Sequence, residues 1–441
     1  MVLLKVRYMR TFFACEICYD IGEILLKHTG KFWMKVLLML ALCSCFSAGS
    51  MALAEEAPVQ MKSVRISWEP VPGAVSYQLA IMKNNENLPE NIISVKKKIF
   101  STGYELDTSV MYAARNYYWK VCPLNYKGEI MGSYSELKPL VQGDINPAAP
   151  KPNTQFTKMS YSPLYPVFSW IPHQGCKSYD IQVFREDAQN KVYKLVREIE
   201  SPGEMFYEYA GYTWPGKYYW QVRGRDASGK VNSEWSEPSF FTVETPVKVA
   251  ALGDSITHGG GAVCTPPSMT LYNWETYCDV PVKNLGRSGD TVQTMLDRFN
   301  TDVLSFEPKI LVVMVGVNNF REGDTAWNIE VALEEINNKC SRAGIIPVFA
   351  TATPVNPVLM KSTIATPAAN WQQEQQLLND WIMQQPYHVD VVQELTDENG
   401  FLKAEMTTDG LHPDMQGKKI IGEKISEYLL KRFPALQLEK K

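Results

Sequence analysis

The segment VKVAALGDSIT, residues 247–257, joins a short apolar run to a Gly-Asp-Ser turn. Four more β-rich apolar runs follow, at residues 280–285, 310–315, 345–350 and 389–392. Helical stretches lie between or after these runs, at residues 291–304, 325–343, 371–385 and 415–433. Strands that alternate with helices of this length form parallel β-α-β crossovers. We therefore predict a doubly wound, flavodoxin-like α/β/α domain of three layers over residues 247–434, with its site at the carboxyl ends of the strands.

The loops that follow these runs carry a serine, a histidine and a carboxylate. Ser255 follows the first run, where Gly253 allows a tight turn, and Asp409 and His412 lie near the C-terminus. A serine hydroxyl is a weak nucleophile until a base takes its proton, and that base needs a carboxylate to hold its tautomer. The three-residue gap lets Asp409 bond one ring nitrogen of His412 and leaves the other nitrogen for Ser255. This pattern predicts a catalytic triad.

Two further loops supply candidate donors for negative charge. They are NLGRSGDT at residues 284–291 and GVNN at residues 316–319. A tetrahedral intermediate needs fixed hydrogen-bond donors at its developing oxyanion. We expect these donors to be the backbone N–H groups of Ser255 and Gly289 and the side-chain amide of Asn318.

These loops, in this order, resemble the blocks of the SGNH (GDSL) hydrolase family, and the resemblance covers about residues 247–434. It implies that Ser255 is the nucleophile, that Gly289 and Asn318 belong to the oxyanion hole, and that Asp409 and His412 are the Asp-x-x-His pair. One departure is Asn319, where many members of the family carry Asp. Because Asn318 itself is retained, this departure bears on the side-chain contacts that support the loop more than on catalysis.

Each of these residues also has a structural interpretation. Ser255 can cap a helix, Asp409 can be a turn residue before Gly410, and His412 can be a surface histidine. Gly289 can be a turn glycine, and Asn318 can cap a loop. The ordered joint occurrence of the blocks favours the catalytic interpretation over these alternatives.

The substrate pocket is less well defined by the sequence. The segment at residues 262–279 is rich in proline and aromatic residues and is a candidate wall for a rigid, small acyl pocket. His258, Trp274 and Asn319 are candidate substrate-binding residues. The HGGG stretch at residues 258–261 is best interpreted as a turn, because no Gly-x-Ser-x-Gly elbow follows it. Neither the phosphate-binding motif Gly-x-x-x-x-Gly-Lys-Ser/Thr nor the zinc motif His-Glu-x-x-His occurs in the sequence, so no metal or organic cofactor is implied.

The region before residue 247 contains a repeat. SWEPVPGAVSYQL at residues 67–79 aligns with SWIPHQGCKSYDI at residues 169–181, and YYWKV at residues 117–121 aligns with YYWQV at residues 218–222. Alternating short runs between Pro and Gly turns predict antiparallel strands. The repeats resemble fibronectin type III domains, which implies two all-β sandwiches at residues 59–143 and 150–244. Trp214 and Trp235 either stack on sugar rings or belong to the sandwich core and its edge.

The N-terminal region has the pattern of a secretory signal. Met34-Lys35 is followed by an apolar run and then by small residues that end at Ala54, after which cleavage is expected. Residues 1–54 are therefore assigned as leader and signal peptide, with Met34 as the suspected true start. A membrane anchor built from this region remains an alternative, and so does a lipid anchor, because Leu42-Cys43-Ser44-Cys45 loosely resembles a lipobox, with Cys43 as a departure at its second position. Five cysteines follow residue 54, and the pair Cys264 and Cys278 is a candidate disulfide.

Composition limits the partners. The chain has 441 residues, 45% of them hydrophobic, and a formal net charge of -4, which lacks the basic excess that nucleic-acid binding requires. We predict a secreted serine ester hydrolase that acts through an acyl-enzyme and removes acetyl or other short acyl groups from carbohydrates. The sandwiches are candidate polysaccharide-binding modules. The alternatives are a lysophospholipase or other lipid acyl hydrolase, and a glycan-binding adhesion protein whose hydrolase-like domain is inert.

Overall fold

The computed structural model describes residues 62–439, apart from residues 110, 112–115, 262–264 and 362–365. The predicted leader, its cleavage site and the alternative anchors at residues 1–54 lie outside this part of the chain. All of the described residues belong to one compact unit, Met61–Lys441. Within the described ranges, none of the helices combines the length and apolar character needed to span a bilayer.

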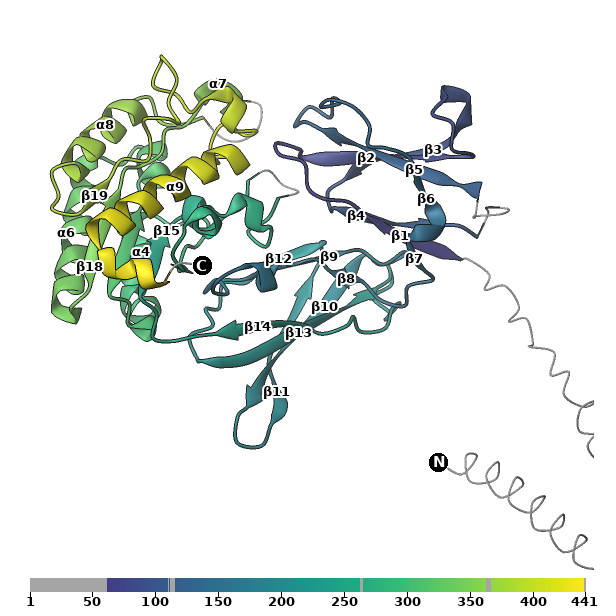
Figure 1. Cartoon of the computed structure of the whole chain (residues 1–441), viewed down its shortest axis with the longest axis horizontal. Helices are drawn as coiled ribbons and strands as arrows, with labels where there is room; N and C mark the ends of the chain where they lie inside the picture. The colour runs from purple at the N-terminus through teal and green to yellow at the C-terminus, as the bar shows by residue number, and fades with distance from the viewer. Residues whose placement is uncertain (1–61, 110, 112–115, 262–264, 362–365, 440–441) are drawn as a thin grey trace, which may run out of the picture. The chain divides into compact units, whose positions relative to one another are not determined.

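The first sandwich packs two antiparallel sheets around a core of its own (Figure 1). One sheet has the order β4-β1-β7 and the other the order β3-β2-β5-β6. The strands are β1 (Ser63–Ser67), β2 (Ser76–Met82), β3 (Ile92–Ile99), β4 (Gly103–Asp107), β5 (Tyr118–Leu124), β6 (Lys138–Pro139) and β7 (Asp144–Ile145).

The second sandwich repeats this architecture, with sheets in the orders β12-β9-β8 and β11-β10-β13-β14. Its strands are β8 (Lys151–Pro152), β9 (Val167–Ile171), β10 (Ser178–Asp187), β11 (Val192–Ser201), β12 (Met205–Tyr207), β13 (Gly216–Arg225) and β14 (Ser239–Val243).

The tryptophans of the sequence repeat occupy matching places in the two sandwiches. The ring centroids of Trp68 and Trp119 lie 6.2 Å apart in the first sandwich, and those of Trp170 and Trp220 lie 6.4 Å apart in the second. The aligned residues therefore form equivalent core contacts, as the repeat predicts.

The C-terminal domain contains a parallel sheet of five strands in the order β16-β15-β17-β18-β19. The strands are β15 (Val249–Gly253), β16 (Lys283–Asn284), β17 (Ile310–Met314), β18 (Ile346–Ala350) and β19 (His388–Val389). Every residue of β15 and of β17 is buried, because layers on both faces cover the sheet. The predicted doubly wound fold is therefore confirmed.

The helices of this domain are α3 (Ser255–His258), α4 (Val292–Asp302), α5 (Val317–Arg321), α6 (Ala326–Ala343), α7 (Pro357–Met360), α8 (Trp371–Ile382) and α9 (Met415–Arg432). Helix α6 packs between α4 and α8, whereas α9, yellow in Figure 1, packs against the 3-10 helices η5 (Thr270–Tyr272) and η6 (Trp274–Tyr277). The other 3-10 helices are η1 (Pro89–Asn91), η3 (Leu140–Gln142), η4 (Phe156–Lys158), η7 (Leu304–Phe306), η8 (Ala404–Met406) and η9 (Pro434–Glu439).

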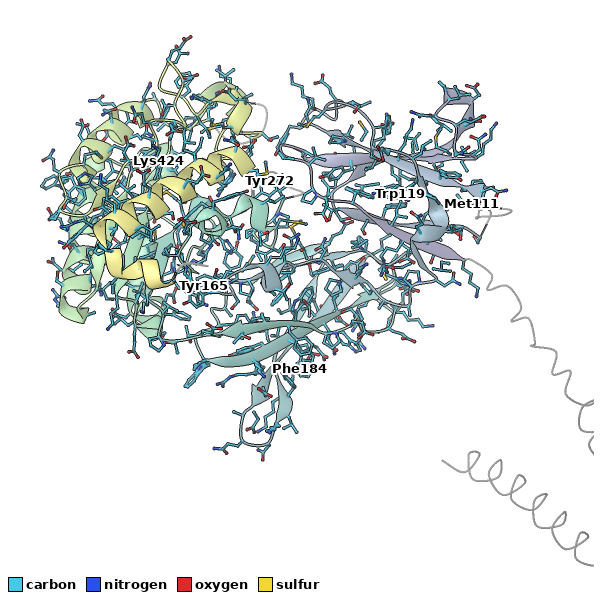
Figure 2. The ribbon with its side chains drawn as sticks, viewed as in Figure 1. Met111, Trp119, Tyr165, Phe184, Tyr272 and Lys424 are labelled. Carbon is cyan, nitrogen blue, oxygen red and sulfur yellow. The ribbon has the colours of Figure 1, made fainter. Side chains whose placement is uncertain are left out.

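The second sandwich and the C-terminal domain share one continuous hydrophobic core. At their junction, the N–H of Leu164 donates to the carbonyl of Asn284 on the edge strand β16, at 2.9 Å. The buried ammonium of Lys283 donates to the carbonyl of Ser162 at 2.7 Å, and the hydroxyl of Tyr165 donates to Asp302 at 2.5 Å. Figure 2 shows Tyr165 at this junction. The second sandwich is therefore fixed to the sheet edge by polar contacts as well as apolar packing.

Candidate functional site

Strand β15 delivers the serine to the carboxyl edge of the sheet. The strand ends at Gly253, where a Cβ atom would lie 2.3 Å from the Thr257 hydroxyl oxygen, so the turn has room only for glycine. Asp254 then caps α3 by accepting a hydrogen bond from the N–H of Ile256 at 2.8 Å. Complete burial raises the pKa of Asp254 to about 6. This cap fixes Ser255 as the first residue of the short helix.

Ser255, His412 and Asp409 form a continuous chain of hydrogen bonds. The Nε2 atom of His412 lies 3.0 Å from the Oγ atom of Ser255, and its Nδ1 atom lies 2.7 Å from Oδ2 of Asp409. The second oxygen of Asp409 accepts from the backbone N–H groups of Leu411 at 2.9 Å and His412 at 2.8 Å. A carboxylate can only accept, so Nδ1 carries a proton and the Nε2 lone pair faces the serine hydroxyl.

Opposing effects set the pKa of Asp409. Burial acts to raise it, but the nearby charge of His412 and the hydrogen bonds from His412 and Leu411 outweigh burial. The pKa of Asp409 therefore lies below its ordinary value, and the group remains a carboxylate at neutral pH.

Two candidate donors lie beside Ser255 around a pocket of about 320 Å³. One is Gly289, whose φ of 88° is a backbone conformation that favours glycine. The other is Asn318, whose Nδ2 atom donates one hydrogen bond to the carbonyl of Asp290 at 2.9 Å. Because an amide nitrogen carries two hydrogens, a second N–H remains for a ligand. The pocket is lined by Tyr207, Ser255, Gly259, Gly260, Gly261, Ser288, Gly289, Asn318, Arg321 and His412.

A buried ionic network supports the loop that carries Gly289. Asp290 forms ion pairs with Arg298 at 2.6 Å and with Arg287 at 2.7 Å. Arg298 also pairs with Asp302 at 2.9 Å and donates to the carbonyl of Gly253 at 3.2 Å. The same guanidinium therefore ties the serine turn to the Gly289 loop.

Comparison with known proteins agrees with this geometry. Residues 251–420 match the model of the GDSL-like lipase/acylhydrolase family. The C-terminal domain is a GDSL-like acylhydrolase. The chain is therefore an ester hydrolase. In the second sandwich, residues 153–245 match the Rha78A-like N-terminal immunoglobulin domain. The expected all-β sandwich is thus confirmed, with an immunoglobulin-like domain where the sequence resembles fibronectin type III. A search among curated proteins found no match.

Solved structures similar to this chain include three hydrolases. A GDSL-like lipase from Bacteroides thetaiotaomicron has 20% identity and a TM-score of 0.35, with 43% of this chain and 93% of that chain covered. A lipase/acylhydrolase from Enterococcus faecalis has 20% identity and a TM-score of 0.34, with 42% and 97% covered. A mutant acetyl-xylooligosaccharide esterase from Geobacillus Stearmophilus has 17% identity and a TM-score of 0.32, with 43% and 94% covered.

Two of the candidate substrate-binding residues, His258 and Asn319, have structural contacts. His258 is only 1% exposed, and its Nε2 atom lies 2.6 Å from the carbonyl of Tyr165 while its Nδ1 atom faces Ser288 at 2.8 Å. Asn319 accepts from the N–H of Val292 at 3.0 Å and donates to Asp324 at 3.0 Å. His258 thus bonds the second sandwich as well as its own domain, and Asn319 bonds within the acylhydrolase domain. Neither residue lines the pocket, and a role in substrate binding stays a prediction.

Trp274 does not line this pocket either. The indole of Trp274 is completely buried, and helix α9 packs on its backbone so closely that a Cβ on Gly422 would lie 2.1 Å from the Trp274 carbonyl oxygen. None of the described residues 265–279 lines the pocket. Cys264 lies outside the described residues, and Cys278 is buried with its sulfur 3.3 Å from the carbonyl of Gly422, so the disulfide between them stays a prediction.

Tyr207 and Arg321 are among the residues lining the pocket that sequence reasoning missed. Arg321 lies at the end of α5 and donates to Oδ1 of Asn318 at 3.3 Å. Its position three residues after Asn318 on a helix was the available signal, because residues at this spacing share a face. Tyr207 belongs to the second sandwich, and its sequence carries no comparable signal.

Proposed function

We propose that this acylhydrolase is a secreted serine esterase that works through an acyl-enzyme and removes acetyl or other short acyl groups from carbohydrates. The observation that carries the proposal is the hydrogen-bond chain from Ser255 through His412 to Asp409. Support for a small acyl group comes from the pocket of about 320 Å³. Support for secretion comes from the signal pattern that ends at Ala54.

In the first half of the reaction, the Oγ atom of Ser255 forms a bond to the ester carbonyl carbon while its proton moves to Nε2 of His412. The negative charge on the carbonyl oxygen is stabilised by the N–H groups of Ser255 and Gly289 and by the amide of Asn318. The bond to the alcohol then breaks, and His412 returns the proton to the leaving oxygen. Asp409 stabilises the imidazolium throughout.

The second half repeats these steps with water. His412 takes a proton from a water molecule as its oxygen attacks the acyl carbon. The bond from the acyl carbon to Ser255 then breaks, and His412 returns the proton to Oγ. The products are a carboxylic acid and the free enzyme.

The test is hydrolysis of p-nitrophenyl acetate, butyrate and octanoate by residues 55–441, followed by acetylated sugars. We expect turnover that falls with chain length and that disappears in Ser255→Ala. The matched control is Ser305→Ala, a change at a partly exposed serine outside the pocket that donates to the carbonyl of Thr301. A preference for octanoate would favour the lipid acyl hydrolase, and no Ser255-dependent turnover would favour the adhesion alternative.

We also propose that the second sandwich contributes to polysaccharide binding through Trp214. Its side chain is 71% exposed, and the guanidinium of Arg185 lies 5.9 Å from the ring. An exposed indole offers an apolar face to a sugar ring. Trp235 is partly buried, with Arg223 over its ring at 4.5 Å, which favours a structural role. Retention on insoluble xylan or pectin should weaken in Trp214→Ala and persist in Trp327→Ala, which alters an equally exposed tryptophan of the acylhydrolase domain.

A further inference from the structure

The pocket beside Ser255 is built by two parts of the chain. Nine of its ten lining residues belong to the acylhydrolase domain, and the tenth is Tyr207, from strand β12 of the second sandwich. Four of the other nine are glycines, and the remaining five are Ser255, Ser288, Asn318, Arg321 and His412. Tyr207 therefore supplies the one large apolar surface among these lining residues.

The backbone at Tyr207 is held rigidly. Tyr207 is paired with Val167 of strand β9, and the next residue, Glu208, donates its N–H to the carbonyl of Pro166 at 3.1 Å. The buried carboxylate of Glu208 accepts from the N–H of Ala210 at 2.9 Å and from Arg197 at 3.1 Å. These contacts fix the end of β12 before any ligand binds.

The second sandwich is also tied to the loop that carries Gly289. The Tyr207 ring packs edge-on against the ring of His258, with the centroids 6.0 Å apart. His258 donates from Nε2 to the carbonyl of Tyr165 and accepts at Nδ1 from the N–H of Ser288 at 3.2 Å. A carbonyl only accepts and a backbone N–H only donates, so His258 is neutral and in one tautomer. Burial agrees with this state, because it lowers the pKa of His258 to about 4.

The position of the acyl group follows from the roles of these loops. His412 returns a proton to the leaving oxygen, so the alcohol part of the ester lies on its side of Ser255. Tyr207 packs instead on His258, which holds Ser288 next to Gly289 on the oxyanion side. A short acyl chain gains free energy by burial against an apolar face, and an aromatic ring limits how long that chain can be.

We propose that Tyr207 is a specificity-determining residue that contacts the acyl group of the substrate, so that the second sandwich completes the active site of the acylhydrolase domain. The proposal rests on the proposed function, since it assigns an acyl group to Ser255. It predicts that the wall supplied by the sandwich sets the longest acyl chain that the enzyme accepts.

The experiment compares Tyr207→Ala, Tyr207→Leu and Tyr207→Phe in the full mature chain with Tyr209→Ala. Tyr209 lies two residues away, is 57% exposed and does not line the pocket, so it is the matched control. The readout is the ratio of kcat/KM for p-nitrophenyl hexanoate to that for p-nitrophenyl acetate. We expect the ratio to rise about tenfold or more in Tyr207→Ala, to rise less in Tyr207→Leu, and to stay unchanged in Tyr207→Phe and Tyr209→Ala.

A second readout avoids dependence on one class of ester. Ethyl and hexyl fluorophosphonates should label Ser255, and the ratio of their labelling rates should change in the same variants. An equal loss of both rates in Tyr207→Ala, or the same ratio in Tyr207→Ala and wild type, would overturn the specificity role. Absence of both turnover and Ser255 labelling in the wild type would instead overturn the proposed function, and the assignment of an acyl contact with it.

Discussion

Replacing Asp409 with Asn isolates what the carboxylate does for His412. The backbone N–H groups of Leu411 and His412 both point at Oδ1, so an amide at this position must keep its oxygen there. Its NH2 group then occupies the place of Oδ2, which lies 2.7 Å from Nδ1 of His412. An amide N–H donates, so Nδ1 must accept, and the ring proton moves to Nε2. The imidazole then has no lone pair for the proton of Ser255.

The expected cost follows from this change of tautomer and from the loss of a negative charge beside the imidazolium. We predict a fall in kcat of about 10⁴-fold, which corresponds to about 5 kcal/mol of lost transition-state stabilisation. The KM should change little, because Asp409 does not line the pocket. Initial rates with p-nitrophenyl acetate, together with a thermal melt of each variant, measure both effects.

The control for this prediction is Asp397→Asn. Asp397 also accepts from two backbone N–H groups, those of Asn399 and Phe401, both at 2.9 Å, but lies outside the pocket. Its replacement should leave kcat unchanged. A well-folded Asp409→Asn enzyme that keeps more than about a tenth of wild-type kcat would refute the tautomer argument.

Asn318→Ala should lower kcat by about 10²- to 10³-fold with little change in KM, because the lost amide stabilises charge that develops only in the transition state. Asn319→Ala should lower the free energy of unfolding by about 1–3 kcal/mol in urea denaturation, because the Asn319 amide bonds Val292 and Asp324. A larger effect on kcat from Asn319→Ala than from Asn318→Ala would reverse the two roles. Lys283→Met should weaken the rise of folding stability with pH, since burial lowers the pKa of Lys283 to about 7 while the unfolded chain keeps the proton up to about pH 10.5. The folded state therefore binds fewer protons than the unfolded chain between these pH values. As pH rises through this window, the free energy of unfolding of the wild type should rise by up to about 5 kcal/mol relative to the variant, as measured by urea denaturation. The control, Lys309→Met at an exposed lysine, should show no such difference.

The loops of the candidate site could be predicted because the runs that precede them have a clear pattern. Strands β15 and β17 are continuous apolar runs, and their carboxyl ends deliver Ser255 and Asn318 to one edge. Strand β16 is shorter than its apolar run. The run includes Pro281, which has no N–H to donate to a ladder, and only Lys283–Asn284 pair with β15.

The walls of the pocket could not be predicted in the same way. Tyr207 reaches the pocket through the docking of one sandwich on the sheet edge, and no local periodicity records that docking. The role of His258 depends on the carbonyl of Tyr165, a residue 93 positions away in the chain. Tryptophan is a residue type often found at binding surfaces, but Trp274 is buried under α9, and this burial is a property of tertiary packing.

The central claim is that Ser255 carries the acyl group during turnover. Rapid mixing with p-nitrophenyl acetate, acid quenching and peptide mass spectrometry test it directly. The account predicts one acetyl group on the peptide that contains Ser255, formed at the rate of the p-nitrophenol burst and absent from Ser255→Ala. Steady turnover with an unmodified Ser255, or undiminished turnover in Ser255→Ala, would contradict it.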